Sequence, residues 1–118
     1  MPEKRRYEGS CHCGKVRFAF NSEPITKGYR CNCSICKRKG AVMSMEYIPK
    51  AEFHPHWILE DFGDYRFGEW NTNHLFCLNC GIYPYDGDFK RGYRVNLGCV
   101  EDIDIFDLDV TLVDGKSL

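Results

Sequence analysis

Hydrophobic and polar residues alternate over several short stretches of the chain. In one of them Val16, Phe18 and Phe20 occupy every second position. A period of two places these side chains on one face of a β-strand, while the residues between them face the other way. Stretches of similar character predict further strands at 43–48, 65–67, 74–76, 82–85 and 93–97.

Turn-forming residues separate these strands and interrupt any helical pattern. Residues 69–72 favour a turn, so the strands at 65–67 and 74–76 are expected to pair as a hairpin, and 88–92 supplies another turn. No segment has a long helical period, and we expect at most a short turn of helix after Cys36. The pattern therefore predicts an all-β fold of short antiparallel sheets with little helix.

Length and composition fit one small folded domain. The chain has 118 residues and a mass of 13.7 kDa, and no repeat or linker divides it, so we assign 1–118 to a single domain. An aromatic content of 14% suits a sheet-rich core. The acidic stretch 102–109 is predicted to be an exposed edge or loop, and the polar tail 114–118 is expected to fray. The large aromatic residues predicted for the core are Trp57, Trp70, Tyr83 and Tyr85.

Charge and targeting signals exclude several classes of protein. The formal net charge is -1, so the sequence does not indicate a strongly basic surface, and no nucleic-acid partner is expected. No run approaches the ~18 consecutive apolar residues of a membrane span, so no membrane association is expected. The first ten residues lack the apolar core of a secretory signal. We therefore expect a cytoplasmic protein with reduced thiols.

Cysteine is the unusual component, with eight residues in the chain. Reduced cysteines at this density in a small domain indicate bound metal rather than disulfides. Seven of them fall in three closely spaced groups, Cys11 and Cys13, then Cys31, Cys33 and Cys36, then Cys77 and Cys80. Cys99 stands apart and is predicted to be a buried, small apolar residue.

The first and third groups resemble each other. Each is a pair of cysteines followed by a glycine, Gly14 or Gly81, and then by an apolar stretch. A glycine there permits the left-handed backbone that turns amides toward the sulfurs. Because zinc takes four ligands in a tetrahedron, we predict that the two pairs form one closed structural zinc site. A different pairing of the groups, or iron in place of zinc, is the alternative.

The middle group offers three ligands from one loop. Three protein ligands and one open position are typical of a catalytic zinc. The alternative is a second closed structural site with Cys99 or a histidine as fourth ligand, and the spacing fits both. The histidines have ordinary interpretations, His12 as an exposed spacer, His74 on a strand, and His54 and His56 in a loop. A proton carrier near the second zinc is the alternative for each.

The three cysteine groups lie in the stretches GSCHCGKVRF, CNCSICKRKGA and LFCLNCGIYPY. In these stretches, and over residues 9–100, the chain resembles the glutathione-dependent formaldehyde-activating enzyme family, whose relatives include the centromere protein V group. The resemblance implies a tent-like, all-β fold of small sheets with two bound zinc ions. By position, it implies a structural zinc on Cys11, Cys13, Cys77 and Cys80. It also implies a second, labile zinc at the site of chemistry, on Cys31, Cys33 and Cys36.

The middle site suggests a particular chemistry. A zinc with three thiolate ligands is a poor Lewis acid, so it is better suited to hold an incoming thiol as thiolate than to generate hydroxide. A held thiolate is a nucleophile toward a small aldehyde such as formaldehyde. With the resemblance, this predicts a carbon–sulfur lyase that acts on a thiol–aldehyde adduct such as S-(hydroxymethyl)glutathione.

Some residues of the middle motif are candidates for binding the substrate thiol. Lys37 and Arg38, with Lys39 beside them, are candidates for pairing with the carboxylates of a glutathione-like thiol, and a solvated basic turn is the alternative. Asn32 stands where the family usually has histidine. The connection at 86–92 is short, which leaves little chain for the segments that grip glutathione in the named enzyme.

Two other classes of function stay open. The first is a two-zinc structural or interaction module that binds protein or nucleic acid. The second is a thiol redox or metal-handling protein that uses the three-cysteine loop. Zinc stoichiometry with and without glutathione distinguishes these classes, and the sequence carries no signal for an oligomeric state.

Overall fold

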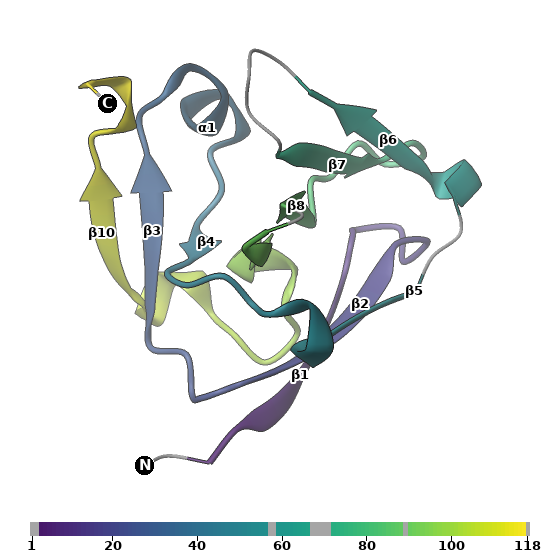
Figure 1. Cartoon of the computed structure of the whole chain (residues 1–118), viewed down its shortest axis with the longest axis horizontal. Coiled ribbons are helices and arrows are strands. Elements are labelled where there is room, and N and C mark those ends of the chain that lie inside the picture. Colours follow the sequence, from purple (N-terminus) through teal and green to yellow (C-terminus); the bar gives the residue numbers. More distant parts are fainter. Residues whose placement is uncertain (1–2, 57–58, 67–71, 89, 118) are drawn as a thin grey trace.

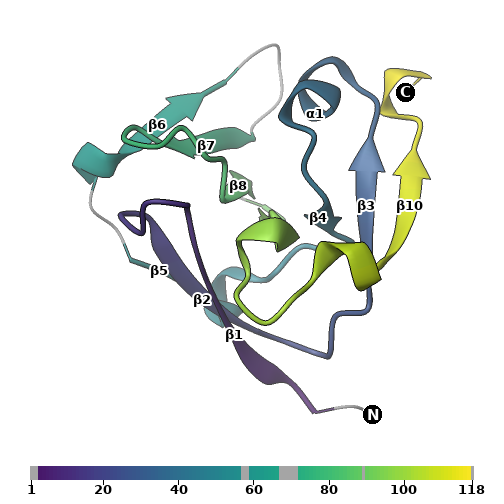
Figure 2. The same ribbon diagram turned by 180° about the vertical axis from the view of Figure 1, so that it is seen from behind.

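Three small β-sheets surround a common core (Figure 1), and Figure 2 shows the same arrangement from behind. The computed structural model describes residues 3–56, 59–66, 72–88 and 90–117. Within this part of the chain the sheets have three, three and four strands. No helix among the described residues has the length and apolar character needed to cross a membrane.

The first sheet is antiparallel and contains the alternating stretch from which its central strand was predicted. Its strand order is β1 (Arg5–Ser10), β2 (Arg17–Ser22) and β5 (Phe53–His56). Phe18 and Phe20 are buried and Arg17 is exposed, as a period of two requires, but Ala19 between the two rings is buried as well. Phe20 lies between Tyr7 and Phe53 in the register, so all three strands contribute an aromatic ring to one face.

The four-stranded sheet contains the predicted hairpin. Its order is β6 (Phe62–Tyr65), β7 (Asn73–Cys77), β8 (Tyr85–Asp88) and β9 (Gly92–Val95). Tyr65 lies opposite His74, so the pairing of 65–67 with 74–76 is confirmed for the described part of these segments. Phe67 and residues 69–71 of the predicted turn, which include Trp70, lie outside the described residues, as does Trp57.

The remaining sheet departs from the predicted antiparallel pattern in one pair. Its order is β10 (Asp109–Val113), β3 (Lys27–Cys31) and β4 (Met43–Ser44), and β10 runs parallel to β3. Neither β3 nor β10 was predicted, because neither shows a clear apolar face. Leu112 on the edge strand β10 is 81% exposed. The acidic stretch 102–109 leads into this edge and is largely exposed, as predicted.

Among the described residues there is one α-helix, α1 (Ser34–Lys39), which lies in the middle cysteine motif. The short helical turn predicted after Cys36 is present through Lys39, and it begins two residues earlier than expected, at Ser34. Cys33 is its extended N-cap, and Gly40 ends it in a left-handed conformation with φ 66°. Short 3₁₀ helices are η1 (Lys50–Glu52), η2 (Leu59–Asp61), η3 (Leu97–Cys99), η4 (Ile105–Asp107) and η5 (Gly115–Ser117).

Two predicted strands are shorter than expected. The stretch 43–48 contains only the two-residue strand β4, although Ile48 forms an isolated bridge with Tyr93. The strand predicted at 82–85 begins at Tyr85. Pro84, directly before it, has no N–H to donate to a neighbouring strand, so the chain cannot join the sheet earlier.

Aromatic rings fill the core between the sheets. Phe53 packs against Tyr93 with the ring centroids 4.1 Å apart, and against Tyr85 at 4.8 Å. Phe18 packs against both members of the second pair, with ring centroids 5.7 Å from Phe53 and 5.3 Å from Tyr85. Tyr85 is fully buried, which confirms its assignment to the core. Because these rings come from different sheets, their contacts hold the sheets together.

Candidate metal centres

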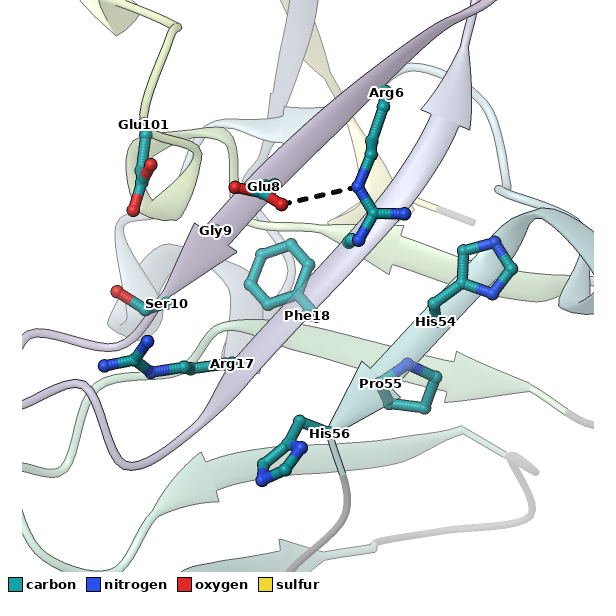
Figure 3. A pocket seen from close by; sticks show the side chains of 11 residues that line it. Arg6, Glu8, Gly9, Ser10, Arg17, Phe18, His54, Pro55, His56 and Glu101 are labelled. Carbon is teal, nitrogen blue, oxygen red and sulfur yellow. Dashed lines mark hydrogen bonds and ion pairs between the residues drawn. The ribbon is translucent and has the colours of Figure 1, made fainter.

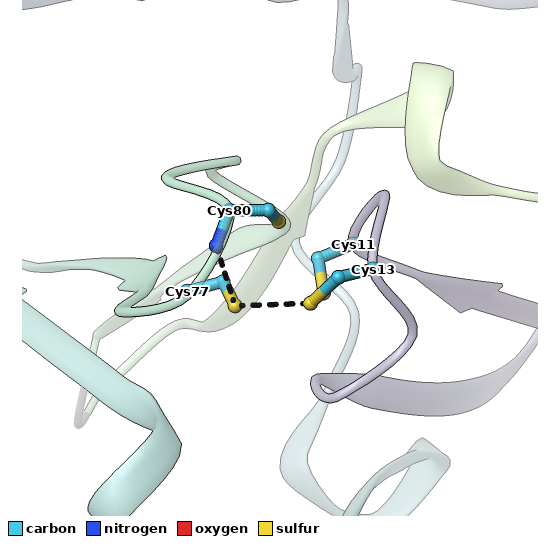
Figure 4. A group of neighbouring side chains, drawn as sticks. All are labelled: Cys11, Cys13, Cys77 and Cys80. Carbon is cyan, nitrogen blue, oxygen red and sulfur yellow. Dashed lines mark hydrogen bonds between the residues drawn. The ribbon is translucent and has the colours of Figure 1, made fainter.

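Two cysteine pairs, far apart in the sequence, meet at one point. Cys11 follows β1, Cys77 ends β7, and Cys13 and Cys80 lie in the turns that follow. All four Sγ atoms lie within 4.8 Å of one another (Figure 4). Cys13 Sγ is 3.6 Å from Cys11 Sγ and 3.7 Å from Cys77 Sγ. A tetrahedral zinc with Zn–S distances of about 2.3 Å separates its sulfurs by about 3.8 Å, so this group fits the ion.

The backbone around this four-cysteine cluster supports the sulfurs. Gly14 and Gly81 have φ angles of 84° and 79°, the left-handed conformation predicted for both glycines. The Gly81 N–H donates to the Cys77 carbonyl at 2.8 Å and closes the turn. The Val16 N–H approaches Cys11 Sγ at 3.3 Å and the Cys80 N–H approaches Cys77 Sγ at 3.5 Å. Such amides orient thiolate ligands and stabilise their charge.

The thiols of this cluster differ in acidity. Burial raises the pKa of Cys11 to about 11. Burial also raises the pKa of Cys80, but hydrogen bonds from the Cys13 and Ile82 amides outweigh it and lower the pKa to about 6. Cys80 is therefore the more readily ionised of these two, and Cys11 would have to lose its proton to bind a metal cation.

The middle group forms a second, three-cysteine cluster. Cys31 ends β3, Cys33 caps α1 and Cys36 lies in its first turn, and all three are partly buried. Their Sγ atoms lie within 4.8 Å of one another. The Cys33 N–H approaches Cys31 Sγ at 3.4 Å. Among the described residues, no further histidine, cysteine, aspartate or glutamate joins this group as a fourth ligand.

Acidity also varies within the three-cysteine cluster. Burial and a hydrogen bond with the Cys33 thiol raise the pKa of Cys36 to about 12. For Cys33, burial acts in the same direction, but the Cys36 amide and the neighbouring thiols outweigh it and lower the pKa. Cys33 is therefore the more readily ionised of the two.

Cys99 lies apart from the three-cysteine cluster. Its Sγ atom is 3.9 Å from the Tyr83 carbonyl oxygen. Burial raises the pKa of Cys99 to about 12, and the charges that add to the effect are those of Cys11 and Cys80. Cys99 is thus closer to the four-cysteine cluster, which already has four sulfurs. It was predicted to be a buried, small apolar residue, and the structure places it in a partly buried position.

The C-terminal segment covers one side of the three-cysteine cluster. Asn32 donates from Nδ2 to Asp114 Oδ1 at 2.9 Å and accepts from the Lys116 N–H at 2.9 Å. Gly115 packs against Cys31, where no β-carbon would fit. The prediction that the tail frays is therefore wrong for residues 114–117, and residue 118 lies outside the described part. Asn32 is thus the side chain that holds this tail.

The three basic residues of the middle motif have different surroundings. Lys37 and Arg38 are exposed, and Arg38 donates to the Ser34 carbonyl at 2.7 Å. Lys39 is partly buried, and its ammonium lies 3.0 Å from His74 Nδ1. His74 is on β7, as predicted for it. The contact was not predicted, because it joins residues 35 positions apart in the sequence.

The other histidines take no part in either cysteine cluster. His12 is exposed, in agreement with its prediction as a spacer. His54 and His56 lie on β5, so the prediction of a loop is wrong for both. They line a hollow of about 670 Å³ on the outer face of the first sheet, with Arg6 and Arg17 among its other lining residues (Figure 3). None of the seven clustered cysteines lines this hollow.

Comparison with known proteins agrees with this arrangement. Residues 6–112 match the family described as "Glutathione-dependent formaldehyde-activating enzyme". This span contains both cysteine clusters. The fold is also similar to the crystal structure of a Rhodobacter sphaeroides protein, with 27% sequence identity and a TM-score of 0.74. That match covers 88% of this chain and 99% of the Rhodobacter chain.

Proposed function

The chain belongs to the glutathione-dependent formaldehyde-activating enzyme family, and from this premise we propose that it is a zinc-dependent carbon–sulfur lyase. The substrate is an adduct of a thiol with a small aldehyde, such as S-(hydroxymethyl)glutathione. The enzyme forms or breaks the bond between the thiol sulfur and the aldehyde carbon. The reaction takes place in the reducing cytoplasm, where both the substrate thiol and the cysteine ligands stay reduced.

The observation that carries this proposal is the incomplete ligand set of the three-cysteine cluster. Cys31, Cys33 and Cys36 bring three sulfurs within 4.8 Å, and no fourth ligand of the types that bind zinc joins them in the described part of the chain. The four-cysteine cluster, by contrast, has a complete set. Closed sites are structural, and sites with an open position bind substrate. The proposed division is therefore a structural zinc on the first and a substrate-binding zinc on the second.

A zinc ion at the three-cysteine cluster would supply one open position at which a thiol binds as its thiolate. The chain's own residues then fix the geometry of attack. Burial of Cys36 and the wall formed by Gly115 restrict the directions from which a substrate reaches the sulfurs. Holding thiol and aldehyde together converts a bimolecular step into one within a complex.

The exposed basic residues of α1 suit the remainder of a glutathione-like substrate. Lys37 and Arg38 follow Cys36 directly on α1, and both side chains are exposed. Glutathione carries two carboxylates, and a guanidinium pairs well with such a group. We propose that these two side chains bind the thiol through its carboxylates, while the sulfur occupies the open position.

Metal content and exchange kinetics test the proposed function. Purified protein is expected to contain two zinc ions, one of which exchanges when glutathione is added. Exchange NMR between free formaldehyde and S-(hydroxymethyl)glutathione is expected to show faster interconversion with protein than without it. Two inert zinc ions and no acceleration would instead favour an interaction module. A disulfide formed readily within the three-cysteine cluster, with loss of one zinc, would favour a redox protein.

Serine variants localise the activity. Cys33→Ser is expected to lose the exchangeable zinc and the acceleration and to keep the other zinc. Cys99→Ala is the matched control, because it removes a partly buried thiol that belongs to neither cluster. It is expected to keep both zinc ions and the acceleration. Equal loss in the two variants would contradict the assignment of activity to the three-cysteine cluster.

A further inference from the structure

Lys39 is a cation that turns inward at the end of α1. Its Nζ atom lies 3.0 Å from His74 Nδ1 and 3.7 Å from the centroid of the Tyr83 ring. Its neighbours Lys37 and Arg38, in contrast, are exposed. Within the described part of the chain, the ion pairs formed at short range do not include Lys39. The ammonium is held by an imidazole and an aromatic face.

Two further polar groups lie behind this contact. The Tyr83 hydroxyl donates to Asp86 Oδ2 at 2.5 Å, and Asp86 is only 8% exposed. Asp86 on β8 is paired in register with His74 on β7. Burial lowers the pKa of Lys39, and the negative charge of Asp86 opposes that shift. The charge on Lys39 is thus disfavoured by burial and supported in part by the buried carboxylate of Asp86.

Lys39 is also close to the three-cysteine cluster. It stands three residues after Cys36 on the same helix, and residues three apart on a helix are neighbours on its surface. The charges of Cys36 and Cys33 act on Lys39 as well as that of Asp86. A methionine could fill the same space without the cost of burying a charge, so packing does not explain a lysine here.

We propose that Lys39 is the general acid of the three-cysteine site, an inference that rests on the proposed function. As the thiol sulfur bonds to the aldehyde carbon, the electron pair of the C=O double bond moves to the oxygen. The Lys39 ammonium gives that oxygen a proton and leaves a hydroxyl group. The neutral amine then takes up the proton that the incoming thiol has released. In the reverse direction the amine accepts the hydroxyl proton as the C–S bond breaks.

His74 and Tyr83 are positioning residues in this scheme. Burial, and then the charge of Lys39, lower the pKa of His74 to about 4, so its ring is neutral at neutral pH. A neutral ring offers Nδ1 as an acceptor, and the lysine must be the donor in the 3.0 Å contact. The Tyr83 face supports the same ammonium from another side. Together they hold Lys39 in place without neutralising it as a carboxylate would.

Replacement of Lys39 tests this role. Lys39→Met is expected to lower kcat for S-(hydroxymethyl)glutathione formation by about 100-fold or more, the usual contribution of a general acid. KM for glutathione and the content of two zinc ions are expected to stay close to those of the unmodified protein. Lys27→Met is the matched control, because Lys27 is an exposed lysine at the start of β3 that has no part in the proposed mechanism, and this variant is expected to keep both kcat and KM. A Lys39→Met variant with unchanged kcat would overturn the inference and leave the proposed function intact.

A second variant separates proton transfer from simple attraction of charge. Arginine keeps the positive charge but does not release its proton. Lys39→Arg is therefore expected to be about as slow as Lys39→Met, and recovery of the rate in Lys39→Arg would overturn the role as general acid.

A readout that does not depend on turnover separates the two proposals. In zinc-loaded protein with ¹³C-labelled lysine, the Lys39 Cε signal is assigned by its absence from Lys39→Arg. Added glutathione is expected to shift this signal. If the unmodified protein does not accelerate adduct formation, the proposed function fails. The Lys39 Cε signal then shows independently whether Lys39 lies beside bound glutathione. If the signal does not shift when glutathione is added, the placement of Lys39 at the thiol site is wrong.

Discussion

Gly115 packs so closely against Cys31 that a β-carbon at position 115 would overlap the Cys31 sulfur. The two residues are far apart in the sequence, yet the C-terminal turn forms a wall of the three-cysteine cluster. Because Cys31 ends a strand, it cannot move aside without disturbing the pairing of β3 with β10. The added methyl group of alanine must therefore displace the turn or the sulfur.

Gly115→Ala is expected to weaken zinc binding at the three-cysteine cluster and leave the four-cysteine cluster filled. Competition with a chromophoric chelator measures both sites separately, with the weaker zinc released first. Gly98→Ala is the control, because the nearest atom to its added β-carbon would be the Asn96 side-chain oxygen at 3.3 Å, a tight contact that a small shift of that side chain relieves, and Gly98 does not have a positive φ. Equal release of zinc from Gly115→Ala and Gly98→Ala would show that the close packing of Gly115 against Cys31 does not affect zinc binding.

The hydrogen bond between Asn32 and Asp114 makes attachment of the tail depend on pH. Hydrogen bonds, first from Asn32 and then from Ser117, lower the pKa of Asp114. A lowered pKa in the folded state means that the carboxylate contributes stability above its ordinary pKa, and that this contribution is lost as the pH falls through the folded value. The amide NMR signals of the tail are expected to titrate below pH 3.8, the ordinary value for this group.

Asn32→Ala supplies the test of that assignment. Without the amide donor, the pKa of Asp114 is expected to rise toward its ordinary value, and the tail signals should titrate at higher pH. The Lys116 N–H also loses its acceptor on Asn32, so its exchange with solvent is expected to become faster. An unchanged titration in Asn32→Ala would show that the 2.9 Å contact does not hold the tail.

The aromatic core makes a large and local contribution to stability. Phe53 is 4% exposed and contacts rings from two sheets. Phe53→Ala is expected to lower the free energy of unfolding by about 3–5 kcal/mol, the usual cost of removing a buried phenylalanine ring. Phe106→Ala is the control, because Phe106 is 90% exposed and such a change alters stability by about 0.5 kcal/mol or less. Urea titration of zinc-loaded protein measures both, and similar midpoints would contradict this account.

The parts of the molecule that could be predicted are those set by local sequence. The spacing of Cys77 and Cys80 and the glycine after them define a turn that needs no information from elsewhere. The period of two in β2 likewise places Phe18 and Phe20 on one buried face, although Ala19 between them is buried as well. For the same reason, the prediction of an all-β chain of small sheets is confirmed.

The parts that could not be predicted depend on contacts between distant segments. Strand β3 buries Gly28 against Val42, and a glycine gives no hydrophobic signal although its lack of a side chain is what allows the contact. Lys39 looked like one of three solvated cations until the fold brought His74 beside it. The tail was predicted to fray because its residues are polar, yet the polar side chain of Asn32 holds it through hydrogen bonds. Each case is a polar or small residue whose partner lies on another element.

The four-cysteine cluster joins the turn after β1 to the turn after β7, so loss of its metal should affect folding as well as binding. Structural zinc in small domains contributes about 10 kcal/mol or more, which is comparable to the whole stability of a domain of this size. Cys77→Ser is therefore expected to be largely unfolded even with excess zinc. Cys36→Ser is expected to stay folded and lose only the exchangeable ion, because β3 and α1 are already adjacent in the sequence. Circular dichroism and bound zinc measure the difference, and a folded Cys77→Ser with one zinc would show that the aromatic core alone is enough to hold the sheets together.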